Sequence, residues 1–302
     1  MLVIAFTWFV HSLLVLLTVA FFTLFERKVI GLAHLRLGPS KVSFLGLLQP
    51  LLDAFKLLSK QNLVSLRASK AVYTLAPLGS LVLSLTFWLF LPSSYFLFSN
   101  SYSFLAFLAL GSLMVLVALL TGWSSNSKYS FLGCLRSVAQ SVSYESVVTT
   151  LVIFFCVLFS TYSLCSISYA KRVLTITIFP IWFFCMLAEA HRAPFDFAER
   201  ESELVSGYNT EYGGAFFAFL FLGEYCVLLF SSAVVYFLFV PLYSCILISP
   251  FMLSAGVLLV SSLSILVRIS FCRFRYDFLI ALAWKSLLPL SLFCLALCYW
   301  LV

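Results

Sequence analysis

Residues 103–122 read SFLAFLALGSLMVLVALLTG, twenty positions without a charged side chain. An α-helix rises about 1.5 Å per residue, so about twenty residues cross the roughly 30 Å hydrocarbon core of a bilayer. The apolar positions are continuous and do not alternate with polar ones, as they would in a strand of a membrane β-barrel. Unpaired backbone groups are costly in hydrocarbon, so this stretch predicts a membrane-spanning helix.

Comparable apolar stretches recur along the whole chain, which has 302 residues, 63% of them hydrophobic and only 10% charged. Soluble proteins carry about 25% charged residues. Hydropathy predicts eight spans, at residues 2–25, 72–91, 103–122, 144–163, 173–191, 214–240, 247–268 and 278–301. We therefore expect an all-α integral membrane protein, with residues 1–302 forming a single polytopic domain and the first apolar run retained as its first helix.

The charged residues gather in alternate loops. The loops on the charged side are 26–71, 123–143, 192–213 and 268–277. Of the 18 Lys and Arg residues, only Lys171 and Arg172 fall on the other side. The positive-inside rule assigns the basic side to the cytoplasm or the mitochondrial matrix, so we expect the N-terminus on the outer side. All 11 acidic residues also belong to the inner half, which the rule does not explain because Asp and Glu contribute little to it.

Within the first inner loop, residues 44–60 predict an amphipathic helix that lies in the headgroup plane. Its apolar face consists of Phe44, Leu47, Leu48, Leu51, Phe55 and Leu58. Its polar face consists of Gln49, Asp53, Lys56 and Lys60.

Four acidic side chains stand in or beside the predicted spans: Glu26, Glu145, Glu189 and Glu224. Ionisable residues at membrane depth are costly and point to function. One interpretation is that each acid pairs with an arginine and fixes the helix register; Glu189 and Arg192, three residues apart, would share a helix face. The other interpretation is that carboxylates at similar depth relay protons.

The third inner loop carries five further acids: Asp196, Glu199, Glu201, Glu203 and Glu211. From composition alone this could be an ordinary solvated acidic loop.

The nine cysteines form no Cys-x-x-Cys pair, and Cys294 and Cys298 lie one helical turn apart in an apolar run. Zinc and iron–sulfur sites need clustered thiolates, so we expect no metal site and interpret the cysteines as small hydrophobes. The sequence also has no G-x-G-x-x-G after a strand, which is the pattern expected of a dinucleotide site.

Short motifs in all four inner loops carry a family resemblance. They are ERKVIG (26–31), LRLGPS (35–40), GLLQP (46–50), DAFK (53–56), GWSSNSKY (122–129), RSVAQSVSYE (136–145), EAHRAPFD (189–196), ESELVSGYNTEY (201–212), RFRYD (273–277) and WK (284–285). In this order they resemble subunit 1 of mitochondrial NADH:ubiquinone oxidoreductase, the quinone-site membrane subunit of respiratory complex I.

The resemblance implies eight transmembrane helices at the place where the peripheral arm docks, and site residues in three groups. The quinone-tunnel group is Glu26, Arg27, Arg36, Asp53, Phe221, Tyr225 and Arg268. The proton-relay group is Glu145, Glu189, Glu199, Glu201, Glu203, Glu211 and Glu224. The ion pairs that structure the loops involve Arg136, Arg192, Asp196, Arg273, Arg275 and Asp277. Two positions depart from the family pattern: Arg200, where many relatives have a small residue, and His191, where they often have Asn or a similar residue.

The implied function is that of a core membrane subunit of the proton-pumping enzyme, without a complete catalytic site in this chain alone. Ubiquinone would be the substrate, bound at the interface with partner subunits. NAD, FMN and the Fe–S clusters would reside only in those partners, which include the peripheral-arm and the antiporter-like subunits. The implied location is the mitochondrial inner membrane, with the N-terminus facing the intermembrane space.

Two other functions compete with this one. An autonomous transporter would show internal repeats and broken helices, and the sequence offers neither. The homologous membrane subunit of energy-converting hydrogenases shares part of the motif set. Copurification separates the three: flavin and several clusters indicate complex I, nickel indicates a hydrogenase, and an isolated active chain indicates a transporter.

Overall fold

The computed structural model describes residues 2–62, 64–65, 68–91, 101–164, 177–196, 207–239 and 249–301, and these residues contain helices and no strand. The α-helices are α1 (Leu2–Ala33), α2 (Gln49–Ser59), α3 (Lys70–Phe87), α4 (Ser103–Ser124), α5 (Lys128–Phe159), α6 (Phe179–Glu189), α8 (Gly214–Phe239), α9 (Ser249–Ser270), α10 (Tyr276–Leu282) and α11 (Leu288–Leu301). Short 3-10 turns are η1 (Phe44–Gly46), η2 (Trp88–Phe90) and η5 (Gly207–Glu211), and the π-helical turn η6 (Ala283–Leu287) joins α10 to α11.

Seven helices of the described residues are long and apolar enough to cross a membrane, with α10, η6 and α11 counted as one. The prediction of an all-α integral membrane protein is therefore confirmed. The remaining expected span, 173–191, is described only from residue 177 onwards. Within it, α6 has 11 residues. At about 1.5 Å per residue, those residues alone do not cross a bilayer.

Two helices extend into segments that hydropathy assigned to loops. Helix α1 continues to Ala33, and α5 begins at Lys128 and runs for 32 residues. The hydroxyls at the polar start of α5 are satisfied within the helix: Ser137 and Ser143 donate to carbonyls three residues earlier, at 2.8 and 2.7 Å. Hydropathy marks where the apolar stretch ends, and the helix continues beyond that point.

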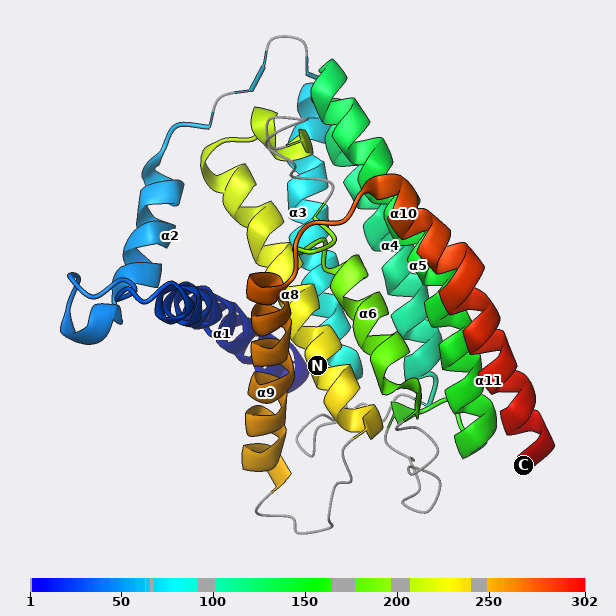
Figure 1. Ribbon diagram of the computed structural model, residues 1–302. Helices are drawn as coiled ribbons and strands as arrows, with labels where there is room; N and C mark the ends of the chain where they lie inside the picture. The colour runs from blue at the N-terminus through cyan, green and yellow to red at the C-terminus, as the bar shows by residue number, and fades with distance from the viewer. Residues whose placement is uncertain are drawn as a thin grey trace.

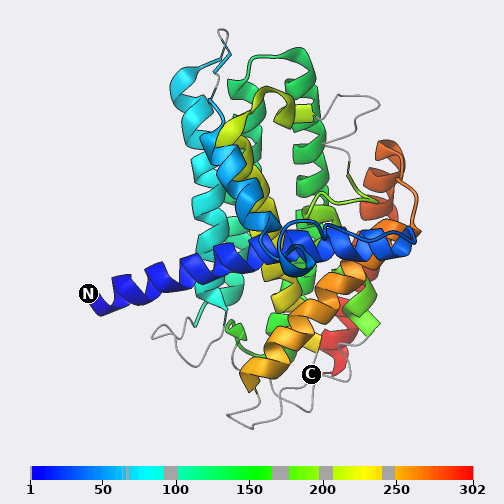
Figure 2. The same cartoon turned by 90° about the vertical axis from the view of Figure 1, so that its left-hand side faces the viewer.

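Most of the long helices lie side by side, and α1 is the exception. Figure 1 shows α3, α4, α5, α6, α8 and α11 as one bundle, with α2 standing apart from it. Figure 2 shows α1 crossing this bundle at a steep angle. Helix α1 packs against α2, α8 and α9, so the charged end of α1 meets three other elements.

The amphipathic helix predicted in the first loop is present as α2, and the turn η1 precedes it. Leu45 adopts a left-handed conformation (φ 57°), which separates residues 44–46 from the helix that follows. In α2, Pro50 is buried while Leu51, Phe55 and Leu58 are exposed. The exposed apolar face fits a helix that lies at a membrane surface.

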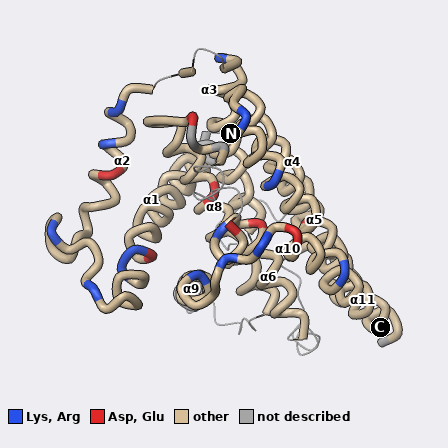
Figure 3. The backbone as a smooth tube through the Cα atoms, turned by 45° about the horizontal axis from the view of Figure 1, so that its top comes forward, with Lys and Arg blue, Asp and Glu red and all other residues tan. Residues whose placement is uncertain are grey.

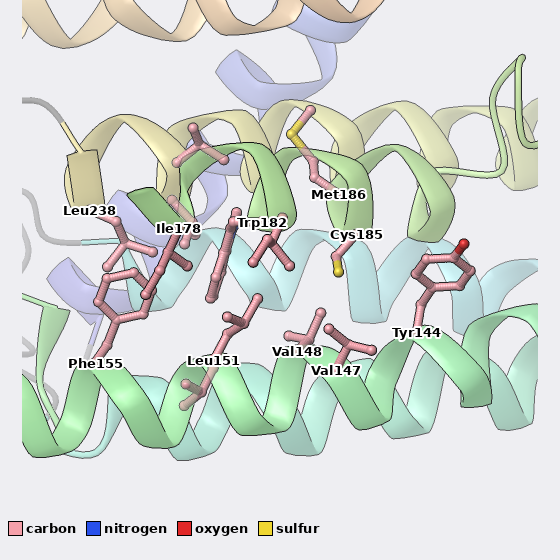
Figure 4. Close-up of a cluster of buried hydrophobic side chains, with 14 of the residues drawn as sticks. Tyr144, Val147, Val148, Leu151, Phe155, Ile178, Trp182, Cys185, Met186 and Leu238 are labelled. Carbon is pink, nitrogen blue, oxygen red and sulfur yellow. The ribbon is translucent and has the colours of Figure 1, made fainter. Parts of the chain in front are cut away.

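The core lies between α5, α6 and α8. Tyr144, Val147, Val148, Leu151 and Phe155 of α5 face side chains of α6 and Leu238 of α8 in Figure 4. The Phe155 and Trp182 rings meet edge to face with centroids 5.4 Å apart. In lipid the hydrophobic effect adds little between helices, so close packing of this kind holds the bundle together.

Helices α4 and α5 are in close contact at Gly122. A Cβ atom placed there would overlap the Cβ and Sγ atoms of Cys134, which is fully buried on α5. Small residues permit such close contacts between membrane helices.

Gly122→Ala should therefore force α4 and α5 apart and destabilise the protein by about 1–3 kcal/mol. The matched control is Gly79→Ala on α3, where the added Cβ would lie 3.7 Å from Val117, an ordinary contact. Thermal inactivation of the assembled protein measures the difference. Equal midpoints for the two variants would contradict this account of the α4–α5 contact.

Candidate functional site

Neighbouring residues on α8 face two different polar clusters. Glu224 lines an internal cavity of about 130 Å³, whereas Tyr225 turns towards α1 and α9. Successive side chains on a helix are rotated by about 100°, so adjacent residues serve different faces. The site is therefore built on both sides of one helix.

The cavity brings together three of the acids expected to form a relay. Glu145 of α5, Glu189 at the end of α6 and Glu224 of α8 all line it. The other walls come from α3 and α4 and are largely apolar, with Phe107 and Met114 among them. A largely apolar space lined by three carboxyl groups can hold water and pass protons between them.

The second cluster is centred on Glu26, which is only 6% exposed near the end of α1. The Tyr225 hydroxyl donates a hydrogen bond of 2.6 Å to its carboxylate. Arg268, in the last turn of α9, forms an ion pair with the other carboxylate oxygen. Three of the expected tunnel residues thus meet where α1, α8 and α9 converge.

Arg192 connects the two clusters. Its Nη2 lies 3.7 Å from Oε2 of Glu224, and its guanidinium lies over the Tyr225 ring at 4.1 Å and the Phe221 ring at 5.9 Å. A guanidinium over an aromatic face gains from the ring quadrupole. Arg192 therefore touches the cavity acid Glu224 and the tyrosine that holds Glu26.

The expected pairing of Arg192 with Glu189 on one helix face is not what the structure shows. Helix α6 ends at Glu189, and His191 adopts a left-handed conformation (φ 48°). This turn carries Arg192 away from the α6 surface, and it pairs with Glu224 on α8 instead. Sequence spacing alone could not reveal the end of the helix.

The remaining expected tunnel residues lie on the first inner loop and the end of α1. Arg27 pairs with Asp53 at 2.7 Å, and the Gln49 amide donates to the same carboxylate at 2.9 Å. The Arg27–Asp53 pair fastens α2 to α1, and Gln49 holds the Asp53 carboxylate from within α2. Arg36 is exposed in the turn after α1, where its backbone N–H donates to the Gly31 carbonyl at 2.9 Å.

Ion pairs and ring contacts link the third and fourth inner loops. Asp196 is 8% exposed and lies 3.9 Å from Arg273, while Arg275 pairs with Asp277 at 3.2 Å on the surface. Beside them the Phe274 ring stacks on Phe195, and the Phe274 N–H donates to the Pro194 carbonyl. Figure 3 shows charged positions on α2, at the end of α9 and on the segment leading into α10. Arg136, half-buried on α5, is the sixth residue of the expected ion-pair group.

Glu211 contributes to this region through its backbone carbonyl. Its carbonyl accepts a hydrogen bond from the Tyr73 hydroxyl, and the Tyr73 ring stacks on Tyr212 at 4.3 Å. The Tyr212 hydroxyl donates to the Thr121 carbonyl and shares a hydrogen bond with Ser124. Burial raises the pKa of Tyr212 to about 12, so the hydroxyl stays protonated at physiological pH.

Three expected relay acids, Glu199, Glu201 and Glu203, lie outside the described residues together with Arg200. Sequence reasoning missed several polar side chains of the cavity wall: Ser80, Thr121, Ser141 and Ser231, together with His191. Their recurrence within apolar spans was a visible signal. This recurrence gave no indication of which polar residues line the same wall of the cavity.

The fold and the site define a polytopic helical membrane protein with half-buried carboxyl groups around a largely apolar cavity. The family model described as NADH dehydrogenase matches residues 6–299. NADH-ubiquinone oxidoreductase chain 1 of Emballonura alecto is 42% identical over 294 residues, covering 95% of this chain and 92% of that one. The same chain of Aedes aegypti is 43% identical (92% and 89% covered), and that of Lampetra fluviatilis is 41% identical (93% and 90%). This chain belongs to the NADH dehydrogenase family that includes these membrane subunits.

The Glu26–Arg268 pair provides a test of the second cluster. Arg268→Met leaves a buried carboxylate without its cation and should destabilise the protein by about 3–5 kcal/mol. The double variant Glu26→Gln/Arg268→Met removes both charges and should recover much of that loss. Thermal inactivation of the assembled protein measures both. If the double variant is no more stable than Arg268→Met, the two residues are not coupled.

Proposed function

We propose that this chain is a core membrane subunit of a proton-pumping NADH:ubiquinone oxidoreductase. It forms the membrane part of the ubiquinone access tunnel and couples quinone reduction to proton translocation. The observation that carries this proposal is Arg192, which joins the Glu26 cluster to the cavity of Glu145, Glu189 and Glu224. The names of the relatives supply the reaction, and the geometry supplies a route by which the chain could take part in it.

The chain needs partners for the redox steps. The described cysteines are scattered, and no three His, Cys, Asp or Glu side chains of the described residues are close enough to hold a metal ion. These donors do not fit an Fe–S cluster, and the sequence has no dinucleotide motif. We therefore assign NAD, FMN and the clusters to the peripheral-arm subunits, and ubiquinone to the interface between those subunits and this chain.

On the quinone side, the end of α1 and the facing parts of α2, α8 and α9 supply the tunnel wall. Phe221 and Tyr225 present aromatic surface there, and Glu26, Arg27 and Asp53 provide charges towards the inner loops. An apolar wall with a few polar groups suits a molecule with a long apolar tail and a polar head. Arg36 and Arg268 complete the group of charges at this end of the chain.

Coupling follows from the position of Arg192. Reduction of a quinone takes up two electrons and two protons, and acidic groups beside the tunnel that give up those protons become more negative. A change near Tyr225 alters the field at Arg192, and Arg192 is the counter-ion of Glu224. The carboxyls of Glu145, Glu189 and Glu224 then redistribute protons, and Glu199, Glu201, Glu203 and Glu211 extend the relay along the third inner loop.

We place the chain in the mitochondrial inner membrane, with the charged loops in the matrix and the N-terminus towards the intermembrane space. Support comes from the basic residues, nearly all of which lie on one side of the predicted spans. The redox partners dock on the side that carries the motifs.

Glu189→Gln in the assembled complex should slow inhibitor-sensitive quinone reduction by about tenfold or more, because a neutral amide cannot accept and release the relayed proton. Asp53→Asn should also slow quinone reduction, because it releases Arg27 at the tunnel wall. The control is Thr150→Val on α5, whose hydroxyl shares a hydrogen bond with Ser291 of α11 and which does not line the cavity. NADH oxidation coupled to proton uptake measures all three. Normal turnover and normal pumping in an assembled variant would remove that residue from the proposal.

A photoreactive ubiquinone should label residues near Phe221, Tyr225 and the charged end of α1. Mass spectrometry of the labelled complex, with a tunnel inhibitor as competitor, maps the sites. Labels confined to the lipid-facing sides of α3 and α11, unaffected by the inhibitor, would exclude the tunnel.

A further inference from the structure

Gln140 is a fully buried amide on α5 that holds two segments of the chain at once. It has no exposed surface, and its Nε2 donates to the carbonyl of Ala188 at 2.9 Å and to the carbonyl of Phe195 at 2.9 Å. Ala188 belongs to the last turn of α6, whereas Phe195 follows the turn beyond it. One side chain of a neighbouring helix therefore closes both ends of the segment 189–194.

The chemistry of the amide fixes its orientation. The NH2 group of Gln supplies two uncharged donors, and two carbonyl oxygens converge on it. If the amide were flipped, its oxygen would face both carbonyls and neither hydrogen bond would form. The last carbonyls of a helix also lack intrahelical partners, so Ala188 needs a donor from outside the regular helix. Besides Gln140, it receives the His191 N–H at 3.3 Å.

The segment between the two hydrogen bonds carries the central residues of the site. Glu189 and His191 line the cavity, and Arg192 contacts Glu224 and Tyr225. His191 adopts a left-handed backbone there, a conformation that a side chain other than glycine keeps only when its surroundings hold it. Helix α5 also carries Glu145, five residues after Gln140, so one helix sets both sides of the cavity.

We propose that Gln140 is a positioning residue: it clamps the turn 189–194 to α5 and thereby fixes Glu189 and Arg192 relative to Glu145 and Glu224. The inference rests on the proposed function for the part played by these charged residues, whereas the clamp itself rests on the two hydrogen bonds. The chemical requirement is a side chain that donates two hydrogen bonds. An apolar side chain of similar size would fill the space without holding the carbonyls.

The test compares Gln140→Met with Ser143→Ala in the assembled complex. Met keeps the volume and removes both donors. Ser143 is a buried residue of the same helix whose hydroxyl donates to the Gln140 carbonyl. Amide hydrogen exchange in the peptide spanning residues 186–196 should become about tenfold faster in Gln140→Met, as expected for loss of hydrogen bonds that hold a turn. Ser143→Ala should leave this exchange at the wild-type rate.

Turnover and pumping of the same variants supply the second readout. Gln140→Met should lower kcat for quinone reduction and the number of protons pumped per NADH, with the KM for NADH unchanged. A residue that served only to fill space would leave both at wild-type values once the complex had assembled. Wild-type exchange in Gln140→Met, or faster exchange with normal turnover and pumping, would overturn the proposal.

Glu189→Gln, measured in parallel, separates the two ideas. If Glu189→Gln is fully active while Gln140→Met exchanges faster and pumps poorly, the relay role of Glu189 fails and the clamp stands through Arg192. If Glu189→Gln is impaired and Gln140→Met matches the wild type in both readouts, the clamp fails and the relay stands.

Discussion

A guanidinium buried beside a membrane cavity must find its charge partners within the protein, and Arg192 finds them on α8. Removing a charge from water costs several kcal/mol, and only well-placed partners offset this cost. The carboxylate of Glu224 and the ring of Tyr225 are those partners. The contact of Arg192 with these two residues depends on α6 ending at Glu189, because a helix that continued would carry Arg192 along its own surface. The break after α6 is therefore what brings the two polar clusters into contact.

The spans could be predicted from the sequence because membrane burial depends mainly on composition. Seven helices follow from the apolar stretches alone. The early start of α5 could not be predicted in this way. Its polar residues Ser137, Gln140 and Ser143 are buried against other parts of the chain, and hydropathy takes no account of such partners. The steep crossing of α1 likewise arises from packing against α2, α8 and α9.

The sequence predicted which residues belong to the candidate site better than it predicted how they are arranged in space. Placing Glu145, Glu189 and Glu224 in the same half of the membrane needed only the span boundaries. That they share one cavity depends on the walls of α3 and α4, which are distant in sequence. The expected Glu189–Arg192 pair assumed a helix that continues, and the left-handed His191 shows that it does not. Gln140 belonged to a recognised motif, yet its role requires knowing that the Ala188 and Phe195 carbonyls converge.

The basic residues divide by type in a way that the one-sided charge count conceals. Each ion pair described above uses an arginine, whereas Lys41, Lys56, Lys60 and Lys128 are exposed. A guanidinium is planar, weakly hydrated and able to stack on rings, so it suits buried pairs better than an ammonium group does. The positive-inside rule therefore accounts for the exposed lysines. Arg27, Arg192, Arg268 and Arg273 are counter-ions of acids on other segments of the chain, so both signs of charge gather on the same side of the predicted spans.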